Sequence, residues 1–399
     1  MTTRLYYTEP YRADFEATVV SCTRQGDRIE ARLDRTAFYP TSGGQPFDTG
    51  RLGGARVVNV EEDDAGDVVH VLDAPLDPGA RVQGAIDWTR RFDHMQQHSG
   101  QHVLSAAFDA VAKARTESFH LGAASSTIDL GRDVGPPEIA AAEDEANRIV
   151  WEDRPVAIRF VTAEDAAALP LRKETLRTGR VRLIDVEGFD LSACGGTHVA
   201  RTGAIGVIAV AGWEKFRGGT RVEFVCGGRA LAGFRRWRDA FAASARVLSV
   251  APEELAAGIE RLQAENKALQ RRLRGLQEQL AAHEARALVA RAAPAGRHLA
   301  VVEALEGWDA QGLKALAVAA AAAEPAAAVV LFTIADPALA VVASGTGSRV
   351  DAAAILTALV AAFGGKGGGK RDLAQGGGLR AAGGPGELVA AARALVASA

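Results

Sequence analysis

Cysteine, long hydrophobic runs and excess charge are all scarce in this sequence, and each absence excludes a class of protein. The cysteines, Cys22, Cys194 and Cys226, are widely spaced and odd in number, which argues against a disulfide framework and for a reducing cytoplasm. The longest apolar run, residues 315–332, is rich in alanine and broken by Glu324 and Pro325. Together with the absence of an apolar segment in residues 1–9, this predicts neither a membrane span nor a signal peptide.

The chain is long enough for several domains but carries little net charge. Its 399 residues are 48% hydrophobic, which is sufficient for two or three domains with buried cores. The formal net charge is −3, so contact with a nucleic acid would depend on local basic clusters and not on the overall charge.

The first 250 residues divide into two patterns. Residues 1–86 contain short alternating apolar and polar stretches cut by Gly, Asp and Pro, which predicts a small β-barrel-like domain. Residues 87–250 predict an α+β domain, since a helix is expected over 91–113 and the later strands do not alternate strictly with helices. The strands expected there are 126–130, 156–160 and 221–225.

Residues 251–293 carry the clearest periodicity in the sequence. Apolar positions recur at steps of four and three, with Arg, Gln, Glu and Lys on the flanks, which is typical of a coiled coil. The pairing helix would come from a second chain, giving a homodimer through 255–283, or from a helical hairpin. The repeating positions are Leu255, Ile259, Leu262, Asn266, Leu269, Leu273, Leu276, Leu280 and His283.

Residues 294–399 predict a compact α/β domain. Strands and helices should alternate up to residue 363, a glycine-rich loop should follow, and a last helix should begin near Glu387. The expected strands are 299–303, 328–334 and 338–344, and the expected helices before the loop are 310–323 and 350–363.

Two pairs of residues have the spacing of metal ligands. His94, His98 and His102 are four residues apart, so neighbours share one helix face, but a single ion can bind only one adjacent pair because the outer two are roughly 12 Å apart along the axis. Cys194 and His198 frame a C-x-x-x-H in which two glycines allow a tight turn. One cysteine among four ligands favours a catalytic zinc site, yet four protein ligands would complete a tetrahedron.

A third polar group lies in the glycine-rich segment AFYPTSGGQPFDTG, residues 37–50. Composition alone allows a simple turn between two strands. However, Thr36, Thr41, Ser42 and Gln45 would also suit a pocket that recognises a small hydroxylated group.

These motifs together resemble the AlaX family of free-standing editing proteins, which is similar to the editing domain of alanyl-tRNA synthetase. The strings that carry the resemblance lie in order between residues 38 and 231, and the region from 251 is similar to the synthetase's C-terminal DHHA1 domain. They are FYPTSGGQPFDTG, DHMQQHSGQHVLSAAF, SFHLG, STIDL, LSACGGTHVARTGAIG, RGGTRVEFVCGGRAL and, near the end, GGKGGGKRDLAQGGG.

The resemblance implies the long form of this family, with four parts: a barrel at 1–86, a zinc-binding editing domain at 87–250, a coiled coil at 251–293 and a DHHA1-like tRNA-binding domain at 294–399. It implies hydrolysis of mischarged tRNA(Ala), chiefly with serine and also with glycine. A synthetase carries a large aminoacylation domain ahead of this region, so no ligase activity is expected.

Site residues carry over by motif. The resemblance implies zinc at His98, His102, Cys194 and His198, with Gln45, Thr36, Thr41 and His94 as catalytic candidates; Thr36 is favoured for the serine hydroxyl. Asp190 and His120 are candidates to orient metal ligands. Candidate tRNA contacts are Lys215, Arg217, Arg221, Lys366, Lys370 and Arg371.

Two other functions compete with this interpretation. One is a tRNA-binding module with a structural zinc and no turnover. The other is an NTPase, because residues 364–370 satisfy G-x-x-x-x-G-K, but Arg371 stands where a magnesium-binding Ser or Thr should be and the motif follows a predicted helix.

Overall fold

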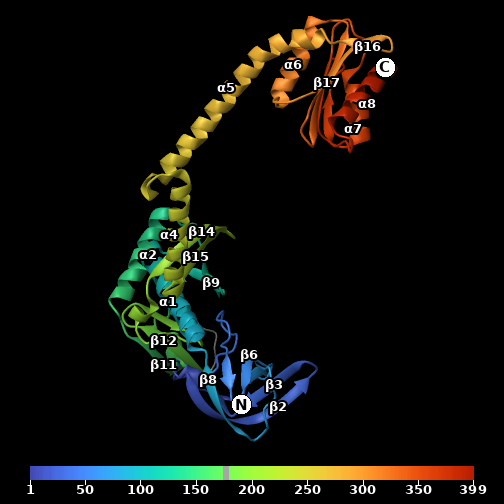
Figure 1. Ribbon diagram of the computed structural model, residues 1–399. Helices are drawn as coiled ribbons and strands as arrows, with labels where there is room; N and C mark the ends of the chain where they lie inside the picture. The colour runs from blue at the N-terminus through green and yellow to red at the C-terminus, as the bar shows by residue number, and fades with distance from the viewer. Residues whose placement is uncertain (174–178) are drawn as a thin grey trace. The chain divides into compact units, whose positions relative to one another are not determined.

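A computed structural model describes residues 1–173 and 179–399 of the chain (Figure 1). Contacts divide the chain into two compact units, Met1–Ala243 and Ser244–Ala399. Among the described residues, none of the helices combines the length and the apolar character needed to cross a membrane.

The first unit begins with a closed six-stranded barrel, as the alternating pattern predicts. Its strands follow the order β2-β3-β7-β6-β5-β8, and in β3 the inward side chains Ile29, Ala31 and Leu33 are buried while their neighbours are not. A short parallel pair, β1 and β4, accompanies the barrel. The elements are β1 Thr3–Arg4, η1 Leu5–Tyr7, β2 Asp14–Gln25, β3 Arg28–Leu33, β4 Arg35–Thr36, β5 Gly50–Leu52, β6 Ala55–Glu62, β7 Val68–Leu72 and β8 Arg81–Ile86.

The rest of this unit is built around a long buried helix, α1 (Trp88–Ala112). Apolar residues of α1, including Leu104 and Phe108, belong to one core with a four-stranded sheet, β14-β15-β10-β9, and helix α2. A separate antiparallel sheet, β11-β12-β13, precedes the second ligand pair. The remaining elements are β9 Thr116–Leu121, β10 Ser126–Leu130, α2 Pro136–Trp151, β11 Val156–Thr162, α3 Ala163–Ala168, β12 Arg180–Val186, β13 Asp190–Ala193, η2 Thr202–Ile205, β14 Ile208–Phe216, β15 Gly219–Cys226 and α4 Gly228–Leu248.

The second unit is a six-stranded mixed sheet with helices on both faces (Figure 1). Its order is β16-β17-β18-β19-β21-β20; α6 and the end of α5 pack on one face, and α7 and α8 pack on the other. The elements are η3 Pro252–Glu254, α5 Leu255–Val289, β16 Ala293–Ala295, β17 His298–Leu305, α6 Ala310–Ala323, β18 Ala327–Thr333, β19 Ala338–Ser344, α7 Ala352–Phe363, β20 Lys366–Gly369, β21 Leu373–Leu379 and α8 Pro385–Ser398.

The prediction of a glycine-rich loop after α7 is wrong. The segment forms an antiparallel hairpin, β20–β21, and β21 pairs with the buried strand β19. The glycines permit a close approach: a Cβ at Gly367 would lie 2.6 Å from the Cα of Gly376. Strand pairing therefore overrides the low strand propensity of glycine.

Helix α5 is 35 residues long, and its heptad side chains face outward. Leu262, Leu269, Leu273 and Leu276 are each at least half exposed. The stripe that predicts a coiled coil is thus present as an uncovered apolar face on a single helix.

Candidate metal centre and pocket

Helix α1 positions the first pair of predicted ligands. Asp87 caps the helix by accepting a hydrogen bond from the Arg90 backbone N–H (3.2 Å). His98 and His102 follow on one face, one turn apart, and both are buried. Because the surrounding helix is packed on nearly all sides, the two imidazoles hold fixed directions.

The second pair comes from the turn after β13. Cys194 and His198 lie on either side of Gly195 and Gly196, and a Cβ at Gly196 would lie 2.1 Å from Cε1 of His98. Only a glycine allows the turn to approach the His98 ring so closely. The C-G-G-T-H motif therefore has a steric reason as well as a chemical one.

The four predicted ligands meet at one point. One donor atom from each of His98, His102, Cys194 and His198 lies within 4.8 Å of all the others. The Cys194 Sγ atom is 3.4 Å from Nε2 of His98 and 3.3 Å from Nε2 of His198. Three imidazoles and a thiol at these separations form a donor set for a transition metal such as zinc.

Each histidine of this cluster uses its other nitrogen for a fixed partner. Nδ1 of His98 donates to Gln45 Oε1 (2.8 Å), and Nδ1 of His102 donates to Asp190 Oδ2 (3.1 Å). Nδ1 of His198 lies 3.1 Å from Ser99 Oγ. Partners of this kind orient metal-binding imidazoles. Asp190 thus fits its expected orienting role, whereas His120 is exposed on β9.

The electrostatics of the cluster favour a thiolate. Burial opposes ionisation of Cys194, but His98 and His198 outweigh it and hold the pKa of the thiol well below its usual value. Burial also lowers the pKa of His198, to about 3. Burial would lower the pKa of His102 as well, but hydrogen bonds to Asp190 and Cys194 raise it to about 9. A thiolate at Cys194 and a neutral His198 are the protonation states that bind a metal, whereas His102 would release its proton when its Nε2 coordinates one.

Gln45 links the glycine-rich segment of the barrel to this cluster. Its Oε1 accepts from His98 and from the Thr197 backbone N–H (3.0 Å), and its Nε2 donates to Thr197 Oγ1 (2.8 Å). The same segment is anchored by a fully buried ion pair between Asp48 and Arg91 of α1. The segment is therefore a structural part of this cluster of candidate ligands and not only a turn.

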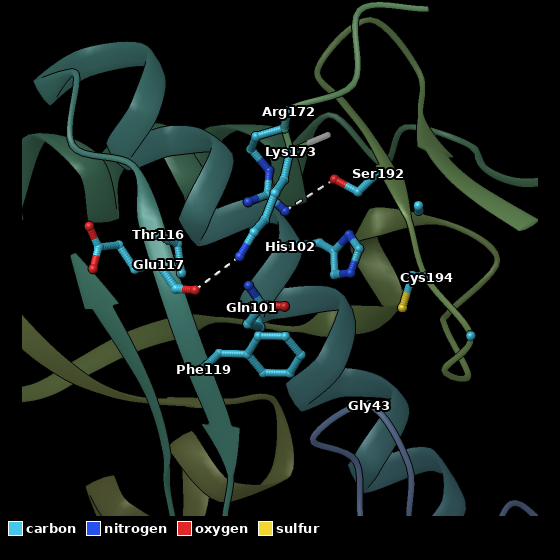
Figure 2. Close-up of a pocket in the computed structure, with 12 residues that line it drawn as sticks. Gly43, Gln101, His102, Thr116, Glu117, Phe119, Arg172, Lys173, Ser192 and Cys194 are labelled. Atoms are coloured by element: carbon cyan, nitrogen blue, oxygen red, sulfur yellow. Dashed lines mark hydrogen bonds between the residues drawn. The ribbon is translucent and has the colours of Figure 1, made fainter. Parts of the chain in front are cut away.

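A pocket of about 230 Å³ opens beside the cluster (Figure 2). His102 and Cys194 line it, together with residues that the sequence interpretation did not single out. Gly43 and Gly195 belong to the motifs of the sequence analysis, but motif spacing gave no signal for the others, because they reach the pocket from α1, β9, β13 and the segment before residue 174. The additional lining residues are Gly43, Gln101, Thr116, Glu117, Phe119, Arg172, Lys173, Ser192, Ala193 and Gly195.

None of the four catalytic candidates is among the described lining residues of this pocket, and Gln45 contacts the cluster instead. Thr36 is buried in the barrel, where its hydroxyl donates to His70 Nε2 (2.8 Å). His94 is buried one turn before His98 and lines a neighbouring pocket of about 320 Å³. Thr41 is exposed near the tip of the glycine-rich segment, two residues from Gly43.

The candidate tRNA-binding cations occupy two hairpins. Lys215, Arg217 and Arg221 lie on or between β14 and β15; Arg221 pairs with Asp129 (2.7 Å), and Lys215 lies 3.2 Å from Asp133. In the second unit, Lys366, Lys370 and Arg371 are exposed on the β20–β21 hairpin. The G-x-x-x-x-G-K string thus lies on an edge hairpin after a helix, which is not the strand-to-helix context of a phosphate-binding loop.

Comparisons with known proteins agree with this geometry. A family described as the threonyl and alanyl tRNA synthetase second additional domain matches residues 181–223, which include Cys194 and His198, and a DHHA1 domain matches residues 298–398. An alanine–tRNA ligase of Methanoregula boonei is 35% identical over 392 residues, which are 94% of this chain but 42% of the ligase. Cys194 and His198 thus lie in a domain of the tRNA-editing class, which ligases and free-standing editing proteins share; the editing proteins are deacylases and not ligases.

Two relatives match along most of their length. The alanyl-tRNA editing protein Aarsd1 of Mus musculus is 32% identical over 75% of this chain and 76% of its own. The alanyl-tRNA editing protein AlaX-L of Pyrococcus horikoshii is 30% identical over 94% of both chains. The chain belongs to the family of alanyl-tRNA editing proteins.

Proposed function

We propose that this chain hydrolyses the ester bond of mischarged tRNA(Ala), chiefly seryl-tRNA(Ala) and also glycyl-tRNA(Ala), and that it uses one zinc ion to do so. The observation that carries the proposal is the convergence of His98, His102, Cys194 and His198, two of which, His102 and Cys194, line a pocket. Family membership supplies the class of substrate, since the relatives are alanyl-tRNA editing proteins.

The residues fit zinc by their chemistry. One thiolate and three imidazoles form a donor set of the kind zinc prefers, and all three imidazoles have partners at Nδ1. A bound zinc ion would supply Lewis acidity toward the ester or a water molecule. Gln45, Ser99 and Asp190 keep the three Nε2 atoms directed at one point, and Arg172 in turn holds Asp190 (2.7 Å).

The catalytic candidates take different roles in this proposal. Gln45 positions His98 and the Thr197 turn, because both ends of its carboxamide are engaged by them. Thr41 is exposed, two residues from the pocket-lining Gly43, and would contact the terminal ribose of the tRNA. The buried Thr36 and His94 act by positioning the barrel segment and α1, respectively.

Exposed cations would hold the rest of the tRNA. Lys215 and Arg217 in the first unit, and Lys366, Lys370 and Arg371 in the second, are placed to neutralise phosphates; Arg221 would hold the first hairpin through Asp129. Binding that depends on such contacts weakens steeply as salt increases.

The test is the release of serine from seryl-tRNA(Ala) by the purified protein, measured beside alanyl-tRNA(Ala). We expect release from the seryl substrate, and a loss of at least about a hundredfold in His98→Ala, because even the partners of metal ligands contribute up to about that factor. His283→Ala, an exposed histidine of α5, is the matched control and should retain full activity.

Tight tRNA binding without release of any amino acid, in protein that holds one zinc per chain, would contradict the proposal. It would favour instead a tRNA-binding module with a structural zinc. A structural zinc site would also have four protein donors, as the cluster of His98, His102, Cys194 and His198 does.

A further inference from the structure

Among the residues that the structure describes, no hydrogen-bond partner reaches one buried polar atom at the pocket. Gln101 lies on α1 between the two histidine ligands and is 2% exposed. Its Nε2 donates to Ser105 Oγ (2.8 Å), but its Oε1 has no hydrogen-bond partner among the described residues. Buried carboxamide oxygens are almost always paired, because an unpaired one forfeits the hydrogen bonds it made with water.

A second glutamine of the same helix shows the usual arrangement. Gln97 is also buried, and its carboxamide is paired at both ends with Cys226: Oε1 accepts from the backbone N–H (2.9 Å) and Nε2 donates to the carbonyl (3.1 Å). Gln97 therefore joins α1 to β15. The Gln101 carboxamide is paired at one end only among the described residues, so joining two elements does not explain why it is buried.

The pocket gives Gln101 access to a ligand. It lines the same cavity as His102 and Cys194, and Figure 2 shows its carboxamide beside His102 and below Lys173. Its orientation is fixed by Ser105, whose Oγ also accepts from Thr116 Oγ1 (2.8 Å). A fixed acceptor in the wall of a pocket is a recognition element for a donor on the ligand.

The charges around this wall select the kind of donor. Lys173 donates to the Glu117 carbonyl (3.0 Å), and Arg172 pairs with Asp190 and Ser192. The Glu117 carboxylate lies instead against Gly131, 2.7 Å from where a Cβ would be. Lys173 therefore adds positive charge near Gln101, whereas the charge of Arg172 is balanced by Asp190, and this wall can receive a neutral hydroxyl as the donor.

We propose that Gln101 reads the side-chain hydroxyl of the seryl group, which donates its proton to Oε1. This inference rests on the proposed deacylation of seryl-tRNA(Ala). A seryl group satisfies the unpaired oxygen, whereas glycyl and alanyl groups leave it unpaired, so the carboxamide favours serine. Thr36, which the sequence favours for this hydroxyl, already donates to His70 in the barrel.

The test compares Gln101→Met with Gln97→Met in the full chain, using seryl-tRNA(Ala) and glycyl-tRNA(Ala) as substrates. In Gln101→Met, kcat/KM for the seryl substrate should fall at least about tenfold, as expected for one lost hydrogen bond in a buried site. The value for the glycyl substrate should stay within about threefold. Zinc content should remain one per chain, and Tm should fall less than in Gln97→Met, since Gln101 loses only its bond to Ser105 Oγ among the described residues and that oxygen still accepts from Thr116.

Gln97→Met should behave in the opposite way. It leaves the backbone N–H and carbonyl of Cys226 without their Gln97 partners, so Tm should fall. The ratio of kcat/KM for the seryl substrate to kcat/KM for the glycyl substrate should stay unchanged. Equal losses on both substrates in Gln101→Met would overturn the inference, because Gln101 would then contact the part that all aminoacyl groups share. An unchanged ratio with a lowered Tm would also overturn it. If the unaltered chain released neither amino acid, the proposed function itself would fail.

Discussion

Gly196 is the residue on which the geometry of the metal centre depends most directly. A methyl group at this position would lie 2.3 Å from Nδ1 of His98 and 2.9 Å from Oε1 of Gln45, so Gly196→Ala must displace the turn that carries Cys194 and His198. We expect zinc stoichiometry, measured by elemental analysis after gel filtration, to fall well below one per chain. Gly54→Ala, with nothing within 4 Å of the added methyl, should keep full zinc; full zinc in Gly196→Ala as well would contradict this account.

The Asp48–Arg91 pair makes a second prediction for single residues. Both side chains are fully buried, so Asp48→Ala leaves a guanidinium without its counter-charge. We expect the free energy of unfolding of the first unit to fall by about 3–5 kcal/mol, measured by urea titration. Asp185→Ala removes a partly exposed pair with Arg159 (2.9 Å), and it should cost less than about 1 kcal/mol. Similar losses in the two variants would show that burial does not set the cost.

Sequence reasoning identified the four residues that come together in the cluster but not the pocket beside it. The His98–His102 and Cys194–His198 pairs are visible because helix and turn geometry fixes ligand spacing within each pair. Gln101, Arg172 and Lys173 lack such a signal. A glutamine on a helix face looks the same whether its carboxamide is paired, as in Gln97, or unpaired, as in Gln101. That difference depends on tertiary packing.

Secondary structure elements were predictable where one periodicity dominated. The barrel strands alternate between buried and exposed positions, and α6 (Ala310–Ala323) matches its expected bounds. The β20–β21 hairpin was missed because glycine has low strand propensity and carries no side chain to reveal a period of two. Its stability comes from pairing with β19, which is distant in sequence.

Helix α5 gives a prediction for a whole element. Its exposed leucines would be covered if the helix pairs with that of a second chain, as the heptads predict. Leu269→Glu would place a charge in that seam, so the full-length protein should sediment as a dimer and the variant as a monomer. Ala264→Glu, on the opposite face of α5, should remain dimeric. A monomeric unaltered chain would contradict intermolecular pairing.

At the scale of the whole first unit, two buried histidines outside the cluster of candidate ligands make the free energy of unfolding depend on pH. Burial lowers the pKa of His70 and of His94 to about 4. Burial keeps His70 neutral although the bond from its Nδ1 to the Ala31 carbonyl (3.2 Å) opposes this shift in pKa; its Nε2 accepts from Thr36. When the unit unfolds, both imidazoles regain a pKa near 6.5.

Between pH 6.5 and 4 the unfolded chain therefore binds more protons than the folded unit, and acid destabilises the fold. The stabilisation is complete above about pH 6.5 and is lost as the pH falls toward 4, at up to about 1.4 kcal/mol per pH unit for each histidine. Urea titration followed by tryptophan fluorescence measures this slope, because every tryptophan except Trp308 lies in the first unit. His70→Gln should reduce the slope of the free energy of unfolding against pH by the contribution of one histidine. His120→Gln, on the exposed face of β9, should not change that slope. Comparing each variant with the unaltered chain cancels the titration of the candidate metal ligands. An unchanged slope in His70→Gln would mean that His70 is not the neutral, buried histidine between barrel strands described above.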